Sequence, residues 1–360
     1  MDLSSSKFNN QKEMSARNPA IDIAKYVAAI LVVAIHTHPF KVIWPVFDFV
    51  FVEILCRFAV PFFAVCTGYY LAISGSIKRS FMKIAKLYCL WSLVYLVYLF
   101  YVWRQNNLEI SWLYLVGWFE GAMCSFSFYH LWYLNAMCWG LFAWGLVSKF
   151  VHEKYYTGLA ICLWILQVLV YVYDGILNLL PGRLMTMVNL FTAPFNGVTM
   201  MLPFLIVGWT LKRYLNGQKI RHTVTGLIVC LICLAAEIVL LRMSGARKFS
   251  FILFTLPSAY FVFAYVYSRG VTYRYNNIPQ YTKRLAAISL TVYCIHPVII
   301  GLITLNSDAG PMVQFILTAA VATILALSYN TLSIKLSKRY KDEKDSRNDT
   351  LARRVDTLRR

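Results

Sequence analysis

A largely apolar run near the start of the chain carries three ionisable residues on what should be one helical face. Residues 21–40 (IDIAKYVAAILVVAIHTHPF) contain Asp22, Lys25 and His36. In an α-helix, with about 100° and about 1.5 Å per residue, Lys25 and His36 lie on one face about 16 Å apart, and Asp22 falls in the same sector. Ionisable groups at membrane depth are costly and normally face a bundle interior or a watery cavity, which predicts a functional site here. The alternative is that Lys25 snorkels to the membrane interface and His36 merely marks the outer end of the helix.

Two further histidines are expected at the depth of His36, in the outer half of a helical bundle. His130 begins a later apolar run in the sequence YHLWYL, and His296 lies far along a run near the end of the chain. A neutral imidazole can accept a proton from a hydroxyl group, so the histidines predict general-base chemistry. Glu53 and Arg57, four residues apart in the second run, are expected to neutralise each other in the same outer half. No HxxxH or HExxH pair occurs, and no metal site is expected.

Four basic residues are expected at the opposite, inner end. Arg79, Lys83 and Lys86 follow the spacing i, i+4, i+7 at the start of the third apolar run, which places them on one helical face, and Lys25 lies near the inner end of the first run. Lys and Arg donate charge-assisted hydrogen bonds to phosphate oxygens, so these residues could bind a nucleotide or a pyrophosphate. The alternative is ordinary anchoring of membrane helices by basic residues on the cytoplasmic side.

Composition identifies the class of protein that holds these residues in place. Of the 360 residues, 59% are hydrophobic and 14% are charged, and the apolar runs reach about 20 residues, which is typical of a protein that crosses a membrane many times. The net charge of +19 gathers in alternate loops, as the positive-inside rule requires, and does not indicate a nucleic-acid partner.

The sequence therefore predicts an all-α polytopic membrane protein, a bundle of about ten transmembrane helices with both termini cytoplasmic. A cytoplasmic N-terminal segment (1–19), a transmembrane domain (20–334) and a basic cytoplasmic tail (335–360) would follow one another. The predicted spans lie near 20–40, 48–74, 81–103, 129–150, 157–173, 195–213, 221–242, 250–268, 284–303 and 312–334.

Three stretches depart from a simple alternation of helices and loops. Residues 111–123 (SWLYLVGWFEGAM) are apolar but too short to span, so they are expected to lie in the interface or to re-enter the bundle. The sixth span contains Asn196, Gly197 and Pro203, which are expected to break or kink it. The tail has few large apolar residues and is expected to be a solvated extension.

Several of these segments occur in the order found in the integral-membrane acyltransferase-3 family. The resemblance extends from about residue 20 to 335 and includes the branch that contains the membrane domain of serine/alanine racemases from vancomycin-resistance systems. Lys stands at positions 25, 83 and 86, where the family usually has Arg, which keeps the charge but loses bidentate phosphate binding. The similar segments are Lys25 to His36, RFAVPFFAVCTGYYL from Arg57, RSFMKIAKLY from Arg79, YHLWYL at 129–134 and SLTVYCIHP at 289–297.

The resemblance implies a membrane acyltransferase of the cell (inner) membrane that uses acetyl-CoA or another acyl-CoA as co-substrate, with no tightly bound cofactor. The acceptor would be an envelope glycan or a small hydroxyl or amine compound, and the lipid bilayer would be the other partner. The implied catalytic residues are His36, Glu53, Arg57, His130 and His296, and the implied donor-binding residues are Lys25, Arg79, Lys83 and Lys86.

Two other functions are compatible with the same residues. In a permease or export component for a serine-like amino acid or a lipid-linked sugar, the charged stripe would line the path of the substrate. A sensor or assembly partner would carry out no turnover.

The charge pattern makes a direct prediction about topology. Single cysteines placed after Arg104 and after Arg183, in a cysteine-free background, should react with a membrane-impermeant reagent added outside intact cells, because these loops are poor in basic residues. A cysteine beside Lys78 should react only after the cells are opened. Labelling of both outer positions solely from the inside would contradict the predicted orientation.

Overall fold

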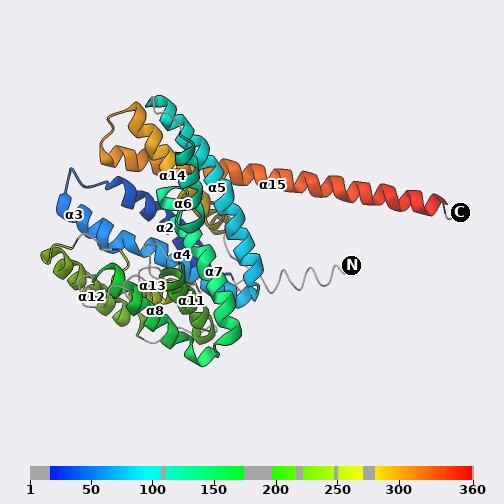
Figure 1. Ribbon diagram of the computed structural model, residues 1–360. Helices are drawn as coiled ribbons and strands as arrows, with labels where there is room; N and C mark the ends of the chain where they lie inside the picture. Colours follow the sequence, from blue (N-terminus) through cyan, green and yellow to red (C-terminus); the bar gives the residue numbers. More distant parts are fainter. Residues whose placement is uncertain are drawn as a thin grey trace.

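The long apolar runs form helices, and no strand occurs in the residues that the computed structural model describes, which are 17–106, 111–173, 197–215, 222–246, 250–270 and 280–358. Figure 1 shows the helices gathered into one bundle, from which the second half of α15 projects. The helices are α2 (Pro19–Thr37), α3 (Pro45–Val50), η1 (Phe51–Leu55), η2 (Cys56–Phe58), α4 (Ala59–Ser74), α5 (Ile77–Gln105), α6 (Trp112–Cys124), η3 (Tyr129–Leu131), α7 (Trp132–Phe150), η4 (Glu153–Tyr155), α8 (Tyr156–Tyr171), η5 (Gly197–Met201), α11 (Leu202–Leu215), α12 (Thr223–Met243), α13 (Thr255–Gly270), α14 (Gln280–Asn306) and α15 (Pro311–Leu358).

Each of the ten predicted spans corresponds to a helix or to a short series of joined helices. Within the described ranges, seven of them are long and apolar enough to cross a membrane by length and composition. The other three, α7, α11 with η5, and α13, are shorter or less apolar, and α11 is enclosed by α4, α7, α8 and α13. The all-helical membrane architecture is therefore confirmed, whereas the side on which the termini lie remains a prediction.

Helix α2 is central to the bundle, and its ends are fixed by local chemistry. Asn18 caps its start, because the side-chain oxygen accepts from the amides of Ala20 (3.0 Å) and Ile21 (3.2 Å), while its side-chain nitrogen donates to the Tyr267 carbonyl on α13 (2.9 Å). The helix ends where His38 adopts a left-handed conformation with φ of 49°. Helix α2 packs against α4, α13, α14 and α15.

Helices α4 and α11 approach each other at two glycines. A β-carbon added at Gly68 would overlap the Leu205 carbonyl of α11, and one added at Gly208 would overlap the Val65 carbonyl of α4. Small residues let membrane helices pack backbone to backbone, where dispersion forces hold them together in the absence of a hydrophobic driving force. This reciprocal contact fixes the second span against the sixth.

The expected break in the sixth span falls at its start. Residues Gly197–Met201 form a π-helix, and the α-helix begins at Leu202, so Pro203 lies in its first turn, where a proline is tolerated. Asn196 lies outside the described residues. Gly197 packs against the backbone of α7 at Ala136 and Gly140, which leaves no room for a side chain.

The tail continues the last span as a helix. Helix α15 runs without interruption for 48 residues, and residues 335–340 are exposed, as expected of a solvated extension. Figure 1 shows the second half of this helix leaving the bundle.

The glycine contact predicts a strong and local effect of substitution. Gly208→Ala or Gly68→Ala should reduce the yield of monodisperse protein in fluorescence-detected size exclusion, because overpacking costs about 1–3 kcal/mol or more. Gly158→Ala is the matched control, because nothing lies within 4 Å of an added β-carbon there. Equal yields for all three variants would show that α4 and α11 are not packed this closely.

Candidate functional site

Three imidazole rings from distant parts of the chain meet in the interior of the bundle. The ring of His36 stacks on that of His296 with centroids 5.2 Å apart, and His130 makes an edge contact with His296 at 5.4 Å. His130 and His296 are 1% and 0% exposed, whereas His36 is half-buried. Tyr129 borders the group, 5.1 Å from His36. We call His36, His130 and His296 the histidine cluster, its end of the bundle the outer end, and the end that holds Lys25 the inner end.

Each histidine comes from a different helix. His36 lies in the last turn of α2, His130 in the single turn η3 that leads into α7, and His296 in the middle of α14. Helix α14 packs against α2 and also contacts η3, and this is why residues 260 positions apart can touch.

A proline in α14 determines which nitrogen of His296 holds its hydrogen. Pro297 has no amide hydrogen, so the Tyr293 carbonyl four residues earlier loses its helical partner. The Nδ1 atom of His296 lies 2.7 Å from this carbonyl oxygen. Because a carbonyl can only accept, Nδ1 must carry the hydrogen, and Nε2 of the neutral ring is then a lone-pair acceptor.

His130 is fixed in the opposite tautomer by the next carbonyl of α14. Its Nε2 lies 3.1 Å from the carbonyl oxygen of Cys294, which also accepts from the Tyr95 hydroxyl at 2.8 Å. Nδ1 of His130 is therefore the unprotonated atom. Tyr293 donates in turn from its hydroxyl to the His130 carbonyl, which ties η3 to α14.

The histidine cluster thus contains two buried lone pairs, on His130 Nδ1 and His296 Nε2, that have no hydrogen-bond partner among the described residues. Buried polar atoms in proteins are nearly always paired, so such exceptions indicate strain or a missing ligand. The His36 side chain also makes no hydrogen bond among the described residues. The cluster can accept hydrogen bonds from a ligand that supplies O–H or N–H groups.

Helix α6 runs back along α5 on the surface of the bundle, with most of its side chains exposed, which favours re-entry over an interfacial position for residues 111–123. Its start lies near the outer end of α5, where Tyr114 is 6.0 Å from Trp103. Near its end, the Ala122 carbonyl accepts from Tyr88 (2.6 Å), which lies about 22 Å further in along α5. The side chain of Asn135 donates to the same carbonyl at 3.0 Å, so the buried helix end is satisfied.

The chain then returns beside α5 and brings His130 to its position. Ser127 and Ser92 share a hydrogen bond of 2.6 Å, and Phe128 stacks on Tyr95 with centroids 4.3 Å apart. The His130 ring makes an edge contact with Tyr95 at 4.8 Å. The re-entrant segment is thus what places this histidine inside the bundle rather than at its surface.

Glu53 and Arg57 form the expected ion pair next to α2. Two guanidinium nitrogens of Arg57, Nε and Nη2, lie 2.9 Å and 2.6 Å from one oxygen of Glu53. Glu53 belongs to the π-helical turn η1, an irregularity that is frequent at functional sites. Turn η2, which contains Arg57, packs against α2, the helix that carries His36.

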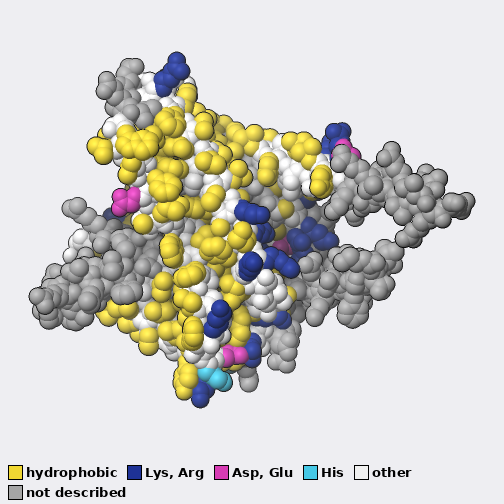
Figure 2. All heavy atoms as spheres, turned by 45° about the vertical axis from the view of Figure 1, so that its right-hand side comes forward, with side chains coloured by type: hydrophobic (Ala, Val, Ile, Leu, Met, Phe, Trp, Pro, Cys, Tyr) yellow, Lys and Arg dark blue, Asp and Glu magenta, His cyan; other side chains and the backbone are white. Residues whose placement is uncertain are grey.

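The four inner cations do not form one group. Arg79, Lys83 and Lys86 are exposed on α5, whereas the ammonium of Lys25 lies 4.3 Å above the Tyr70 ring of α4. No hydrogen bond, ion pair or ring contact among the described residues joins Lys25 to α5. In Figure 2 the right-hand side of Figure 1, where α5 lies, has come forward, and Lys and Arg side chains are gathered on this face.

A polar contact at the outer end of the bundle, between the start of α3 and the end of α2, was not predicted from the sequence. Nδ1 of His38 lies 2.8 Å from Asp48, whose other oxygen accepts from the Phe40 amide at 2.9 Å. This contact fixes the connection between α2 and α3 above His36. In the sequence, the proline at position 39 was the available signal for a turn after α2.

A comparison with protein families now adds a further finding. The profile of the family described as "Acyltransferase domain" (acyltransferase-3) matches residues 18–331. The chain belongs to the acyltransferase-3 family.

Two characterised relatives are similar over most of this acyltransferase-3 chain. An "Amino-acid racemase" of Enterococcus faecalis is 27% identical over 351 residues, which cover 90% of this chain and 47% of the relative. A "Serine/alanine racemase" of Enterococcus gallinarum is 24% identical over 335 residues, 89% of this chain and 46% of the relative. The chain spans about half the length of these relatives. No solved structure matches.

Replacement of Pro297 should disturb the histidine cluster without destabilising the fold of this acyltransferase-3 protein. Pro297→Ala restores an amide that competes with His296 for the Tyr293 carbonyl, so His296 loses its fixed tautomer while the helix gains a hydrogen bond. The midpoint of thermal unfolding in detergent should stay equal or rise, and any reaction that depends on the histidine cluster should slow about tenfold or more. Pro45→Ala, in the first turn of α3, is the control and should change neither. Full activity of Pro297→Ala would show that the tautomer has no functional role.

Proposed function

We propose that this protein is an integral-membrane acyltransferase that moves an acyl group, in the first instance acetyl, from acyl-CoA at the cytoplasmic side to a hydroxyl group of an envelope glycan or a related acceptor. The supporting observation is the histidine cluster, with its two unpaired buried lone pairs, in a chain of the acyltransferase-3 family. The proposal places the protein in the cell membrane, with both termini in the cytoplasm.

His36 is the proposed general base. It is the least enclosed ring of the histidine cluster, and no hydrogen bond among the described residues fixes it, so it can turn toward a substrate and receive a proton. His130 Nδ1 and His296 Nε2 would accept hydrogen bonds from the acceptor and orient it. Each is held in its tautomer by a backbone carbonyl, so neither must rearrange to do so.

Arg57 is the proposed electrostatic partner. Its Nε and Nη2 are engaged by Glu53, which holds the guanidinium in a fixed orientation and leaves Nη1 without a partner among the described residues. A fixed donor aimed at the place where negative charge develops stabilises the transition state of acyl transfer.

In the proposed acyl transfer, His36 carries a proton from the acceptor to the leaving thiolate. The acceptor oxygen attacks the thioester carbonyl of the donor while its proton passes to His36. The tetrahedral intermediate collapses, the carbon–sulfur bond breaks, and the leaving thiolate takes the proton. The products are an acyl ester and free coenzyme A, and an amine acceptor would give an amide by the same sequence.

The donor would approach from the inner end. Lys25 and His36 lie on one face of α2, about 16 Å apart along the helix, so one extended ligand could contact cations at one end and the histidine cluster at the other. Arg79, Lys83 and Lys86 are exposed on α5 and would attract a polyanion toward that end.

A second function has some support in the names of the relatives. Because the chain matches about half of proteins described as amino-acid racemases, it would serve in this alternative as a permease for a small amino acid such as serine. The buried lone pairs would then bind the ammonium group of that amino acid.

Substitution of His36 distinguishes the two functions. Purified wild-type protein given acetyl-CoA and a glycan acceptor should release free coenzyme A, whereas His36→Ala and His36→Gln should both lower the rate at least about 100-fold, since an amide cannot take a proton at neutral pH. His222→Gln is the matched control and should be fully active, because His222 is exposed and lies outside the cluster.

Binding of acyl-CoA should survive the substitutions at His36, because the lost step is proton transfer. The transferase proposal fails if the wild type transports serine in liposomes but never consumes acyl-CoA. Partial transport by His36→Gln would add support for the permease, since an amide can still form hydrogen bonds.

A further inference from the structure

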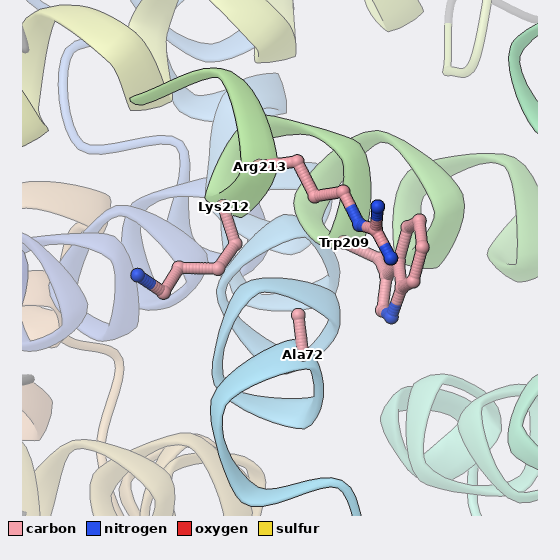
Figure 3. A pocket seen from close by; sticks show the side chains of 4 residues that line it. All are labelled: Ala72, Trp209, Lys212 and Arg213. Atoms are coloured by element: carbon pink, nitrogen blue, oxygen red, sulfur yellow. The ribbon is translucent and has the colours of Figure 1, made fainter. Parts of the chain in front are cut away.

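A cavity of about 340 Å³ lies at the inner ends of α4 and α11. It is lined by Ala72 of α4 and by Trp209, Lys212 and Arg213 of α11. Figure 3 shows Lys212 and Arg213 extending on opposite sides of Ala72, with the guanidinium beside the indole ring. The volume corresponds to roughly ten water molecules, which is room for a phosphate or a pyrophosphate group.

Arg213 is held in place before any ligand arrives. Its guanidinium lies 4.8 Å above the Trp209 ring, and its Nη2 is 2.5 Å from Glu153. The indole is itself wedged between Trp144 and Tyr156, with centroids 5.6 Å and 5.2 Å away. A guanidinium fixed in this way loses little freedom on binding, and Glu153 occupies only part of its hydrogen-bonding capacity.

The other polar groups of the cavity are also donors. Within the described part of the chain, no carboxylate lies within ion-pair distance of Lys212, and the Trp209 indole nitrogen has no acceptor. With Glu153 included, one net positive charge remains. Lys25 adds another cation to this end of α4, because it lies over Tyr70, two residues before Ala72. A cavity with free donors and excess positive charge fits an anion with several acceptor oxygens.

We propose that this cavity binds a phosphate group, and that the molecule bearing it is the nucleotide end of the acyl-CoA donor. The assignment of the phosphate to acyl-CoA rests on the proposed function. The site differs from the one expected from the sequence, since none of Arg79, Lys83 and Lys86 lines it. The headgroup of an anionic phospholipid has the same chemistry and is the other source to be tested.

The test uses the full chain in nanodiscs of neutral lipid, with coenzyme A and 3′,5′-ADP as probes in calorimetric titrations. Lys212→Gln should weaken the binding of both probes about five- to tenfold, because one charge-assisted contact is lost at a partly exposed site. Glu153→Gln should tighten it several-fold, because a negative charge that opposes an anion is removed while Arg213 keeps its contact with the Trp209 ring. Lys154→Gln, with the same charge change outside the cavity, should stay within twofold.

A second arm adds phosphatidylglycerol to the nanodiscs. Competition of this lipid with coenzyme A in the wild type, absent in Lys212→Gln, would support the phosphate site and assign it to a lipid headgroup. Equal binding of all probes by wild type, Lys212→Gln and Glu153→Gln would overturn the proposal.

The outcome is separable from that of the proposed function. Continued release of coenzyme A with unchanged Michaelis constant in Lys212→Gln would overturn the phosphate site and leave the transferase intact. Binding that depends on Lys212 in a protein that never releases coenzyme A would leave the site intact and remove the transferase.

Discussion

The arrangement of the site depends on a proline that removes one hydrogen bond from the middle of a membrane helix. Inside a bilayer no water replaces the missing donor, so the freed carbonyl must find a partner in the protein. In α14 the Tyr293 carbonyl finds it in His296, and the neighbouring Cys294 carbonyl binds Tyr95 and His130. The backbone thereby fixes both tautomers and leaves each imidazole with one lone pair. A requirement of membrane folding and a requirement of proton chemistry are met by the same two carbonyls.

The remaining helices bring His36 and His130 to this point. Helix α2 ends directly after His36, because the next residue but one, His38, adopts a left-handed conformation and its contact with Asp48 holds the following turn. The re-entrant α6 carries the chain inward along α5, and the returning segment places His130 at the depth of Tyr95. At the inner end, close packing of α4 on α11 at two glycines positions the cavity that holds Lys212 and Arg213. The two ends are thus built by different helices, and α2 extends from one end to the other.

Sequence reasoning was strongest where a pattern along one helix sufficed. Apolar runs gave the ten helices, and residue counts placed His36, His130 and His296 at one depth, where their rings in fact meet. It was weakest for relations between helices. Periodicity gives a residue's depth and face but not its neighbours, so Lys25 was grouped with the α5 cations although it contacts Tyr70. The sequence did not single out Lys212 and Arg213 as a site, because their cavity forms only where they meet Ala72 and Glu153, which are distant in the sequence. The tail was predicted as a solvated extension, but its helical continuity with the last span was not, because composition alone does not show where a helix ends.

The central claim is that α2 and α14 bring two histidines into contact within the membrane. It can be tested by replacing His36 and His296 with cysteine in a variant that lacks the nine native cysteines, and by treating membranes with a short bifunctional thiol reagent. A protease site inserted between α13 and α14 then separates the fragments unless they are cross-linked. Cysteines at Tyr26 and Thr323, which share a 2.8 Å hydrogen bond between α2 and α15, provide the positive control. The account predicts cross-linked fragments for both pairs, whereas separated fragments for the histidine positions alone would contradict it.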